Sequence, residues 1–411
     1  MAEGATPPAE GKLALALSGG GSRAMAFHLG CLRALREAGL LDKVAVISSV
    51  SGGSVLAALY CHTPGGFEDF EANARGLIAR GFLRPALWKA LTTSEGVKAL
   101  FFFSVIAAER LAARTVGLVL RILRIKSRVG WRWISQSLIQ RRASRTTILR
   151  RVFSSIFKSD FLPALRADRP KLIVVACELQ TKSAFYFAAD EVSSWRFGAT
   201  PPENIEIAEA VSASAAYPIA LPALDREFEF TKKDGSTATD RVILTDGGVY
   251  DNLGLAPLWP DRDGSISFHV GRYSRIIACR AGYALEAAPA PSLAPTRVAA
   301  AFESIFARAQ NFAVKRLFDL RELGKLDDFL HPYLGQADHR LACPPPDLIR
   351  CEEVAGYPTD FSAMPAEWID KLVKRGEQVT WALLAEHWTT FLTEADEIAA
   401  SAGSRSGHGD A

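Results

Sequence analysis

A buried strand, a serine followed by two glycines and a helix succeed one another early in the chain. Residues 44–47 read Val-Ala-Val-Ile, which is typical of a buried parallel strand, and the apolar run over residues 55–60 predicts the helix that follows. Ser51 and the Gly52-Gly53 pair therefore lie on a tight turn between the two elements. Such a turn exposes the hydroxyl, needs small neighbours and directs the positive end of the helix dipole at the serine oxygen. The pattern predicts an α/β fold in which Ser51 is a candidate nucleophile.

A candidate base for this serine lies 195 residues later in the chain (246 − 51), where Asp246 is followed by Gly247 and Gly248. A strand is expected over residues 242–244, directly before this group. Asp-Gly-Gly by itself is a common turn signal, and so is a serine between small residues. Only the order and spacing of these groups, taken with the glycine loop upstream, favour a catalytic arrangement over unrelated turns.

That glycine loop supplies candidate donors for an anion. Residues 13–17 have the pattern of a buried strand and run into Ser18, three glycines, Ser22 and Arg23, and residues 24–38 predict a helix that ends at Gly39. Backbone amides at a helix N-terminus bind anions, and glycines leave those amides uncovered. Removing one such donor costs about 2.7–4 kcal/mol of transition-state stabilisation. The predicted oxyanion hole consists of Gly19, Gly20 and Gly21.

Three blocks, in this order, resemble the motifs of the patatin-like phospholipase family. The G-x-G-x-x-G loop of the family corresponds to residues 19–24, with Ala24 at the last glycine position. Its G-x-S-x-G turn corresponds to residues 49–53, with Ser49 at the first glycine position, and its D-G-[AG] motif to residues 246–248. Weaker similarities are found at residues 178–187, 212–218 and 250–254. The resemblance covers roughly residues 12–325, apart from a basic stretch.

The resemblance implies a three-layer α/β hydrolase with a mostly parallel central sheet and a Ser-Asp dyad in place of a triad. Ser51 would be the nucleophile and Asp246 the general base, and an acyl-enzyme would be hydrolysed by water. Arg23 would orient the glycine loop or contact a phosphate. The implied substrate is a phospholipid or a related acyl-lipid. No cofactor and no metal ion are expected.

Other interpretations of the same residues stay open at this stage. A dinucleotide-binding loop would need an acidic residue at the end of the second strand, where serines stand, and a P-loop would need Gly-Lys-[Ser/Thr]. A Ser-His-Asp esterase acting on soluble esters could draw on His269, His331 or His339. We expect His28 to be a packing residue, and the adjacent Cys61 and His62 lack a partner pair for zinc. A catalytically silent lipid-binding scaffold is the alternative outside enzymology.

Positive charge is concentrated in one stretch of the chain. Arg110 to Arg151 contains eleven arginines, one lysine and no acidic residue, so the remainder of a chain of net charge +3 carries −9 (3 − 12). Helical spacing predicts an amphipathic helix, broken near Gly130, with an apolar stripe of Leu111, Leu118, Ile122, Ile125, Val129 and Trp133. Its flank carries Arg110, Arg114, Arg121, Arg128 and Arg132. This stretch predicts docking on an anionic membrane, and the alternative is a stripe packed on the core with solvated arginines.

Two further uses of this region are less favoured. The apolar run over residues 99–108 is shorter than the roughly 20 residues that cross a bilayer. Nucleic-acid binding, with Trp131 and Trp133 as stacking groups, lacks a recognisable module. Six scattered cysteines are expected to be reduced, buried thiols, and residues 1–11 lack the features of a signal peptide. The expected location is the cytoplasm, peripheral to the inner face of a membrane, and no protein partner is predicted.

We expect one large domain with additions. Residues 1–11 and 401–411 are predicted to be a disordered lead-in and tail, and residues 12–325 the hydrolase domain, with the basic insertion over about 97–151. A long helix is expected over residues 297–323. Residues 326–400 are predicted to form a helical extension, with separate helices over 366–375 and 378–394.

Overall fold

A ten-stranded sheet forms the centre of the protein. The computed structural model describes residues 13–123, 145–218, 221–263, 270–282 and 294–389. The strands are β1 (Leu13–Leu17), β2 (Val44–Ser49), β3 (Lys171–Glu178), β4 (Ser183–Phe187), β5 (Val192–Ser194), β6 (Gly198–Thr200), β7 (Leu224–Thr231), β8 (Thr237–Asp246), β9 (Arg275–Cys279) and β10 (Asp328–Leu330). Their order is β10-β9-β1-β2-β3-β4-β5-β6-β7-β8, with a further pairing between β3 and β8.

The predicted α/β class and parallel central sheet are confirmed. Strands β10, β9, β1, β2 and β3 pair in parallel, whereas every pairing among β3 to β8 is antiparallel. Because β3 also pairs with β8, the antiparallel strands close into a ring beside the parallel half. Strand β10 lies beyond residue 325, so the segment after that residue contributes to the sheet as well as to helices.

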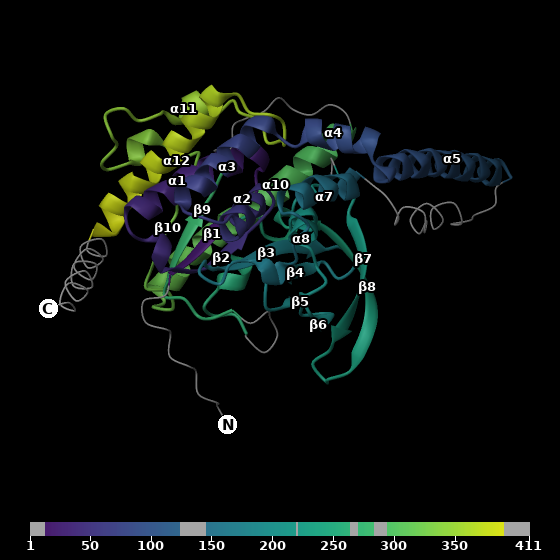
Figure 1. Ribbon diagram of the computed structural model, residues 1–411, viewed down its shortest axis with the longest axis horizontal. Coiled ribbons are helices and arrows are strands. Elements are labelled where there is room, and N and C mark those ends of the chain that lie inside the picture. Colours follow the sequence, from purple (N-terminus) through teal and green to yellow (C-terminus); the bar gives the residue numbers. More distant parts are fainter. Residues whose placement is uncertain (1–12, 124–144, 219–220, 264–269, 283–293, 390–411) are drawn as a thin grey trace.

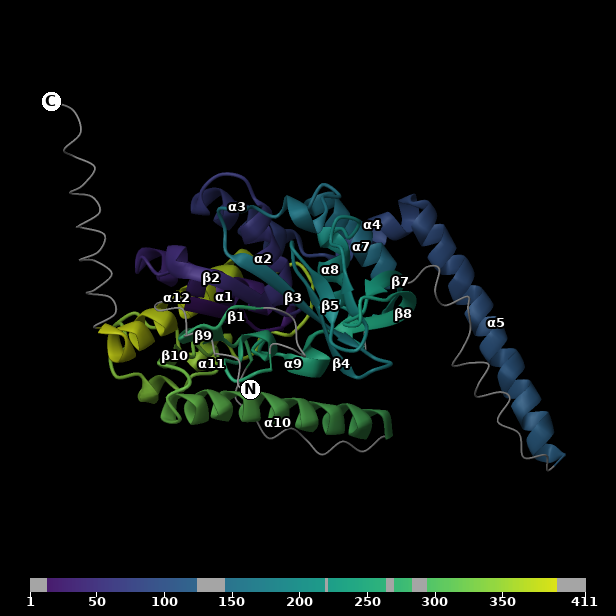
Figure 2. The same ribbon diagram turned by 90° about the horizontal axis from the view of Figure 1, so that it is seen from below.

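Helices cover both faces of this sheet, which gives three layers (Figures 1 and 2). The main helices are α1 (Gly21–Glu37), α2 (Gly52–His62), α3 (Phe67–Arg80), α4 (Leu83–Thr92), α5 (Ser94–Ile122), α7 (Arg145–Ile156), α8 (Ile207–Ser214), α9 (Gly248–Asp251), α10 (Ala294–Glu322), α11 (Cys351–Val354) and α12 (Ala366–His387). Figure 2 shows α10 below the sheet and α1, α2 and α3 above it. The leucines of β1 belong to the core on the α1 side and its alanines to the core on the α10 side, as alternation along a strand requires.

The C-terminal helix α12 is one continuous helix, so the prediction of two separate helices around residue 376 is wrong. Gly376, which lies between the two predicted helices, packs against α1: a Cβ there would approach the Phe27 carbonyl oxygen to 2.1 Å. Reciprocally, a Cβ on Gly30 of α1 would come within 1.9 Å of the Val373 carbonyl oxygen. The two glycines let the helix backbones touch, and this close packing offsets the helix propensity that glycine lacks.

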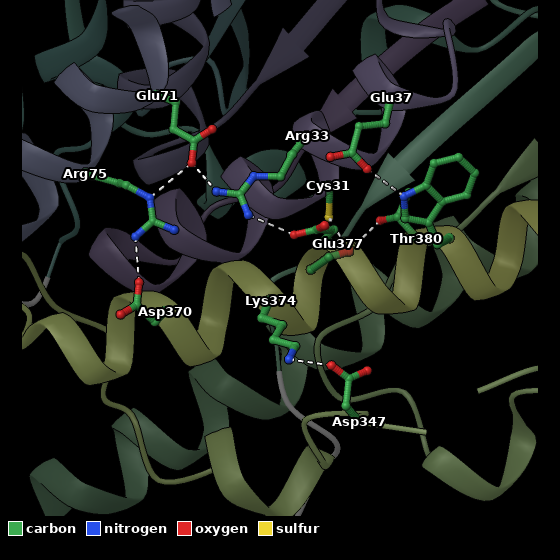
Figure 3. Close-up of polar contacts among 12 residues, drawn as sticks. Cys31, Arg33, Glu37, Glu71, Arg75, Asp347, Asp370, Lys374, Glu377 and Thr380 are labelled. Atoms are coloured by element: carbon green, nitrogen blue, oxygen red, sulfur yellow. Dashed lines mark hydrogen bonds and ion pairs between the residues drawn. The ribbon is translucent and has the colours of Figure 1, made fainter. Parts of the chain in front are cut away.

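Ion pairs join the outer surface of α12 to α1 and α3 (Figure 3). Arg33 of α1 contacts Glu71 of α3 and donates to Glu377 of α12 at 2.9 Å. Arg75 of α3 bridges Glu71 at 3.1 Å and Asp370 of α12 at 2.7 Å. The network therefore attaches the C-terminal segment to the first helix of the domain.

Helix α5 extends away from the body of the molecule in both ribbon views (Figures 1 and 2). Its apolar side chains Leu111, Leu118 and Ile122 are exposed, so in the described part of the stretch the apolar stripe does not pack on the core. The remainder of the predicted amphipathic helix, from residue 124 to residue 144, lies outside the described residues, as do residues 1–11 and 401–411. Within the described part of the chain no helix combines the length and apolar character needed to span a membrane.

Candidate active site

Ser51 lies on the turn between β2 and α2 with φ 53° and ψ −120°. Positive φ is rare for a residue with a side chain, and holding it there costs about 1–3 kcal/mol. We call this turn, residues 49–53, the serine elbow. The neighbouring glycines allow its geometry because the elbow packs directly on the backbone of other segments. A Cβ on Gly52 would lie 2.2 Å from the Gly21 carbonyl oxygen, and one on Gly53 would lie 2.6 Å from the Leu17 carbonyl oxygen. The elbow therefore needs a glycine at both positions.

Asp246 ends β8 directly beside the elbow. The pairing of β8 with β3 sets Asp246 opposite Ala176, so the antiparallel part of the sheet brings it to Ser51. Its carboxylate interacts with the Ser51 hydroxyl and accepts a hydrogen bond from the Gly248 N–H at 2.7 Å. Burial raises the pKa of Asp246 to about 6, against these two interactions, which lower it. At neutral pH the group is ionised and its basicity is higher than that of an exposed aspartate.

The glycine loop after β1 approaches Ser51 from the other side. A Cβ on Gly19 would lie 2.5 Å from Asn252 Oδ1 and 3.2 Å from the Ser51 Cβ, so this close approach requires a glycine. The Gly19 N–H donates to the Asn252 carbonyl oxygen at 3.0 Å. Gly20 and Gly21 have φ of 145° and 60°, and neither N–H finds an acceptor among the described residues. Of the three predicted donors, two are therefore available to an oxyanion.

The side chain of Arg23 is buried and turned towards backbone. Its Nε donates to the Ala281 carbonyl oxygen at 3.0 Å and its guanidinium donates to the Tyr357 carbonyl oxygen at 3.2 Å. The Ser22 N–H donates to the Asp360 carbonyl oxygen at 2.7 Å. The segment before α12 thus holds the start of α1, and these contacts favour orientation of the loop over phosphate contact as the role of Arg23.

Sequence reasoning missed the segment that links the serine to the aspartate. Ser214, the last residue of α8, accepts a hydrogen bond from the Ser51 N–H at 2.9 Å and donates its own proton to the Val175 carbonyl oxygen at 2.6 Å. Two residues later, the Ala216 carbonyl oxygen accepts from the Asp246 N–H at 3.0 Å. The similarity over residues 212–218 was a signal for this segment, but nothing in it distinguishes Ser214 from Ser212.

No described histidine hydrogen-bonds to Ser51 or Asp246. His28 is fully buried in α1, and burial lowers its pKa to about 3, so it is a neutral packing residue as predicted. His331 contacts the Ala278 carbonyl oxygen at 2.7 Å, and burial lowers its pKa to about 4, while His339 is exposed on the surface. His269 lies outside the described residues. Across the described ranges, no group of three or more His, Cys, Asp or Glu side chains is placed to hold a metal ion.

Comparison with solved structures shows where this fold recurs. Human GIVD cytosolic phospholipase A2 aligns with a TM-score of 0.53 at 15% identity, covering 93% of this chain and 60% of that one. Its complex with methyl gamma-linolenyl fluorophosphonate and terbium chloride aligns with a TM-score of 0.50 at 15% identity, covering 93% and 59%. VipD from Legionella pneumophila scores 0.38 at 16% identity, covering 92% and 67%. This chain thus spans about three fifths of the length of the human enzyme.

Comparison of sequences gives the family. No curated protein sequence matches this chain significantly. The family model described as patatin-like phospholipase matches residues 15–259, which include the glycine loop, the serine elbow and Asp246. This match covers more than half of the 411 residues. The chain belongs to the patatin-like phospholipase family.

Proposed function

We propose that this protein is a lipid acyl hydrolase that cleaves fatty-acyl esters of phospholipids or related lipids through an acyl-enzyme on Ser51. One observation carries the proposal: the hydroxyl of a strained, buried serine interacts with the buried carboxylate of Asp246, beside two glycine amides that have no acceptor among the described residues. Family membership supports it, and so does the fold shared with a structure named as a phospholipase A2.

The geometry supports a two-step mechanism without an imidazole. Ser51 Oγ attacks the ester carbonyl carbon while Asp246 accepts its proton, and the amides of Gly20 and Gly21 donate to the oxyanion. The C–O bond to the alcohol then breaks, and the alcohol leaves with the proton from Asp246. Water, deprotonated by Asp246, attacks the acyl-enzyme, and the fatty acid departs as the Ser51 hydroxyl is restored. A base with a pKa of about 6 is suited to both proton transfers at neutral pH.

Two alternatives make different predictions. In a Ser-His-Asp esterase, one histidine substitution would abolish activity as completely as Ser51→Ala does. In a silent scaffold, the serine would not react with an electrophile although lipid would bind. The interaction between Ser51 and Asp246, and the lack of a hydrogen bond from a described histidine to either residue, favour the dyad.

A fluorophosphonate probe tests the proposal directly, because it reacts with nucleophilic serines. We expect peptide mapping to find the label on Ser51, and Ser51→Ala to lose both labelling and ester hydrolysis with unchanged circular dichroism. His28→Ala, His269→Ala, His331→Ala and His339→Ala should each keep most activity. Incubation with phospholipids, lysophospholipids and neutral lipids, followed by mass spectrometry of the products, identifies the substrate class. Labelling of Ser49 or Ser54 in place of Ser51, or loss of activity in one histidine variant that still folds, would contradict the mechanism.

We also propose that the basic stretch from Arg110 to Arg151 draws the enzyme to an anionic membrane surface on the cytoplasmic side. Arg114 and Arg121, within the described part of this stretch, are exposed on a helix that leaves the body of the molecule. Each basic residue near an anionic leaflet contributes roughly 1 kcal/mol, and salt screens this attraction. Replacing Arg121, Arg124, Arg128 and Arg132 by glutamine should weaken sedimentation with anionic vesicles. Equal sedimentation of the wild type and this variant would favour the alternative in which the arginines are solvated and bind no membrane.

A further inference from the structure

Helices α4 and α5 expose a large apolar surface, which membrane docking through arginines alone would not require. In the described part of these helices, large apolar side chains from both are between 41% and 71% exposed. We call this set the arm face: Leu87, Trp88, Leu91, Val97, Phe101, Leu111, Val116, Leu118, Val119, Ile122 and Leu123. Soluble proteins rarely expose so many large apolar side chains together, and such patches mark interaction sites.

Five members of the arm face lie along one side of α5. At about 100° per residue, positions 97, 101, 111, 118 and 122 fall within an arc of about 100° around the helix axis. The exposed side chain of Lys98 lies on one flank of this stripe, and those of Arg114 and Arg121 lie on the other. An apolar stripe between cationic flanks is the pattern of a helix that lies in the plane of a lipid interface.

The body of the protein leaves the far part of this surface, between residues 111 and 123, exposed to solvent. Helix α5 packs on α4 and α7 near its start, and its far end extends away from the sheet and the other labelled helices in both views (Figures 1 and 2). Between residues 111 and 123, the side chains that the structure describes are solvent-exposed, except that of Leu120, which is partly buried. A partner outside the described residues is therefore needed to remove this apolar area from water.

The cationic side chains of α5 favour a lipid surface over a second copy of the chain as the partner of the arm face. A second copy of the chain would bring α5 against α5, and the charged side chains of α5 between residues 111 and 122 are those of Arg114 and Arg121, both cationic and exposed. Pairing would therefore place like charges together, which is destabilising. A lipid surface with anionic headgroups accepts the apolar stripe in its acyl region and the cationic flanks at its headgroups.

We propose that the arm face inserts into the acyl region of an anionic lipid surface and anchors the enzyme there by apolar contact. The inference rests on the proposed function in one respect, since a lipid substrate resides in the surface that the arm would bind. It differs from docking by arginines alone in one measurable way. Salt should release only part of the bound protein, because the apolar contribution is not screened.

The test uses full-length protein carrying Ser51→Ala, so that binding is measured without hydrolysis and does not depend on the proposed activity. Sedimentation with vesicles of phosphatidylglycerol and phosphatidylcholine is compared for this protein, for an arm variant with Leu118→Gln and Ile122→Gln, and for a control with Ile305→Gln and Leu323→Gln. The control residues are apolar, 70% and 69% exposed, and belong to or directly follow α10. Circular dichroism verifies that each variant is folded.

We expect the partition constant of the arm variant to fall about tenfold while the control stays within about twofold of the parent. At 1 M salt, the parent should retain measurable binding and the arm variant should retain none. Equal binding of the arm variant and the parent would overturn the proposal. A concentration-dependent dimer of the parent in sedimentation velocity that the arm variant abolishes would overturn it too, since the arm would then be covered by a second copy.

Discussion

Ser214→Ala should impair catalysis without touching either member of the proposed dyad, Ser51 and Asp246. The Ser214 hydroxyl accepts from the Ser51 N–H at 2.9 Å, lies 3.0 Å from Ser54 Oγ and donates to the Val175 carbonyl oxygen at 2.6 Å. Alanine leaves the Ser51 N–H without an acceptor in a site that is almost fully buried. Because Ser51 is held at positive φ, loss of this bond lets the elbow relax away from the reactive conformation.

The size of the effect follows from the cost of an unpaired buried donor. Leaving one buried amide without a partner costs about 1–3 kcal/mol. At 1.36 kcal/mol per factor of ten, this corresponds to a loss of roughly 5- to 150-fold in the population of the reactive elbow. Since only that population turns over, kcat should fall by this factor while KM changes little. In the proposed mechanism the pKa of Asp246 governs the pH profile, so the midpoint of that profile should not move.

Ser212→Ala is the matched control. Ser212 is equally buried on the same helix, but its hydroxyl donates to the Ala208 carbonyl oxygen at 2.6 Å within that helix. Both variants and the parent are assayed for hydrolysis of a soluble short-chain ester, for the rate of fluorophosphonate labelling and for urea unfolding. The reasoning is refuted if Ser214→Ala and Ser212→Ala have the same kcat, or if Ser214→Ala changes only KM or only the free energy of unfolding.

Two further predictions concern charge burial and helix packing. Activity on a soluble ester should rise with pH through about 6 and level off above it, because Asp246 must be ionised to accept a proton. The folded pKa of Asp246 exceeds its unfolded value of 3.8, so ionisation of this group lowers the stability of the fold as pH rises from about 4 to 6. Asp246→Asn should be nearly inactive, yet at pH 7 it should be more stable than the parent by up to about 3 kcal/mol. This gain in stability should vanish below about pH 4. Equal stability of the two proteins across this range, measured by urea unfolding, would show that the carboxylate is not buried. Gly30→Ala should destabilise the fold by more than about 1 kcal/mol, because the added Cβ pushes α12 away from α1. Gly76→Ala on α3 is the control and should be neutral or stabilising, since nothing lies within 4 Å of a Cβ there. Similar unfolding midpoints for the two variants would contradict the close packing of α1 and α12.

Local chemistry explains why much of the site could be predicted. Strand β1, strand β2 and the serine elbow depend on contiguous residues, because the short apolar run of β1 and the β-branched run of β2 favour buried strands and only glycines permit the elbow to pack on backbone. The continuity of α12 could not be predicted in the same way. Glycine disfavours a helix by propensity, but Gly376 continues one because the backbone of Phe27 and Cys31 in another helix lies against it.

The sequence alone determined the nucleophile candidate, the aspartate, the glycine loop and the parallel strands that present them, since each is encoded by a short run of residue types. Tertiary structure alone decided how these parts meet. In the folded chain the Gly19 N–H donates to the Asn252 carbonyl oxygen, and Arg23 donates to the carbonyl oxygens of Ala281 and Tyr357. The Ser214 hydroxyl accepts a hydrogen bond from the Ser51 N–H. The reason is physical: a hydrogen bond between groups 163 residues apart depends on where the sheet register places both backbones, and no local pattern carries that information.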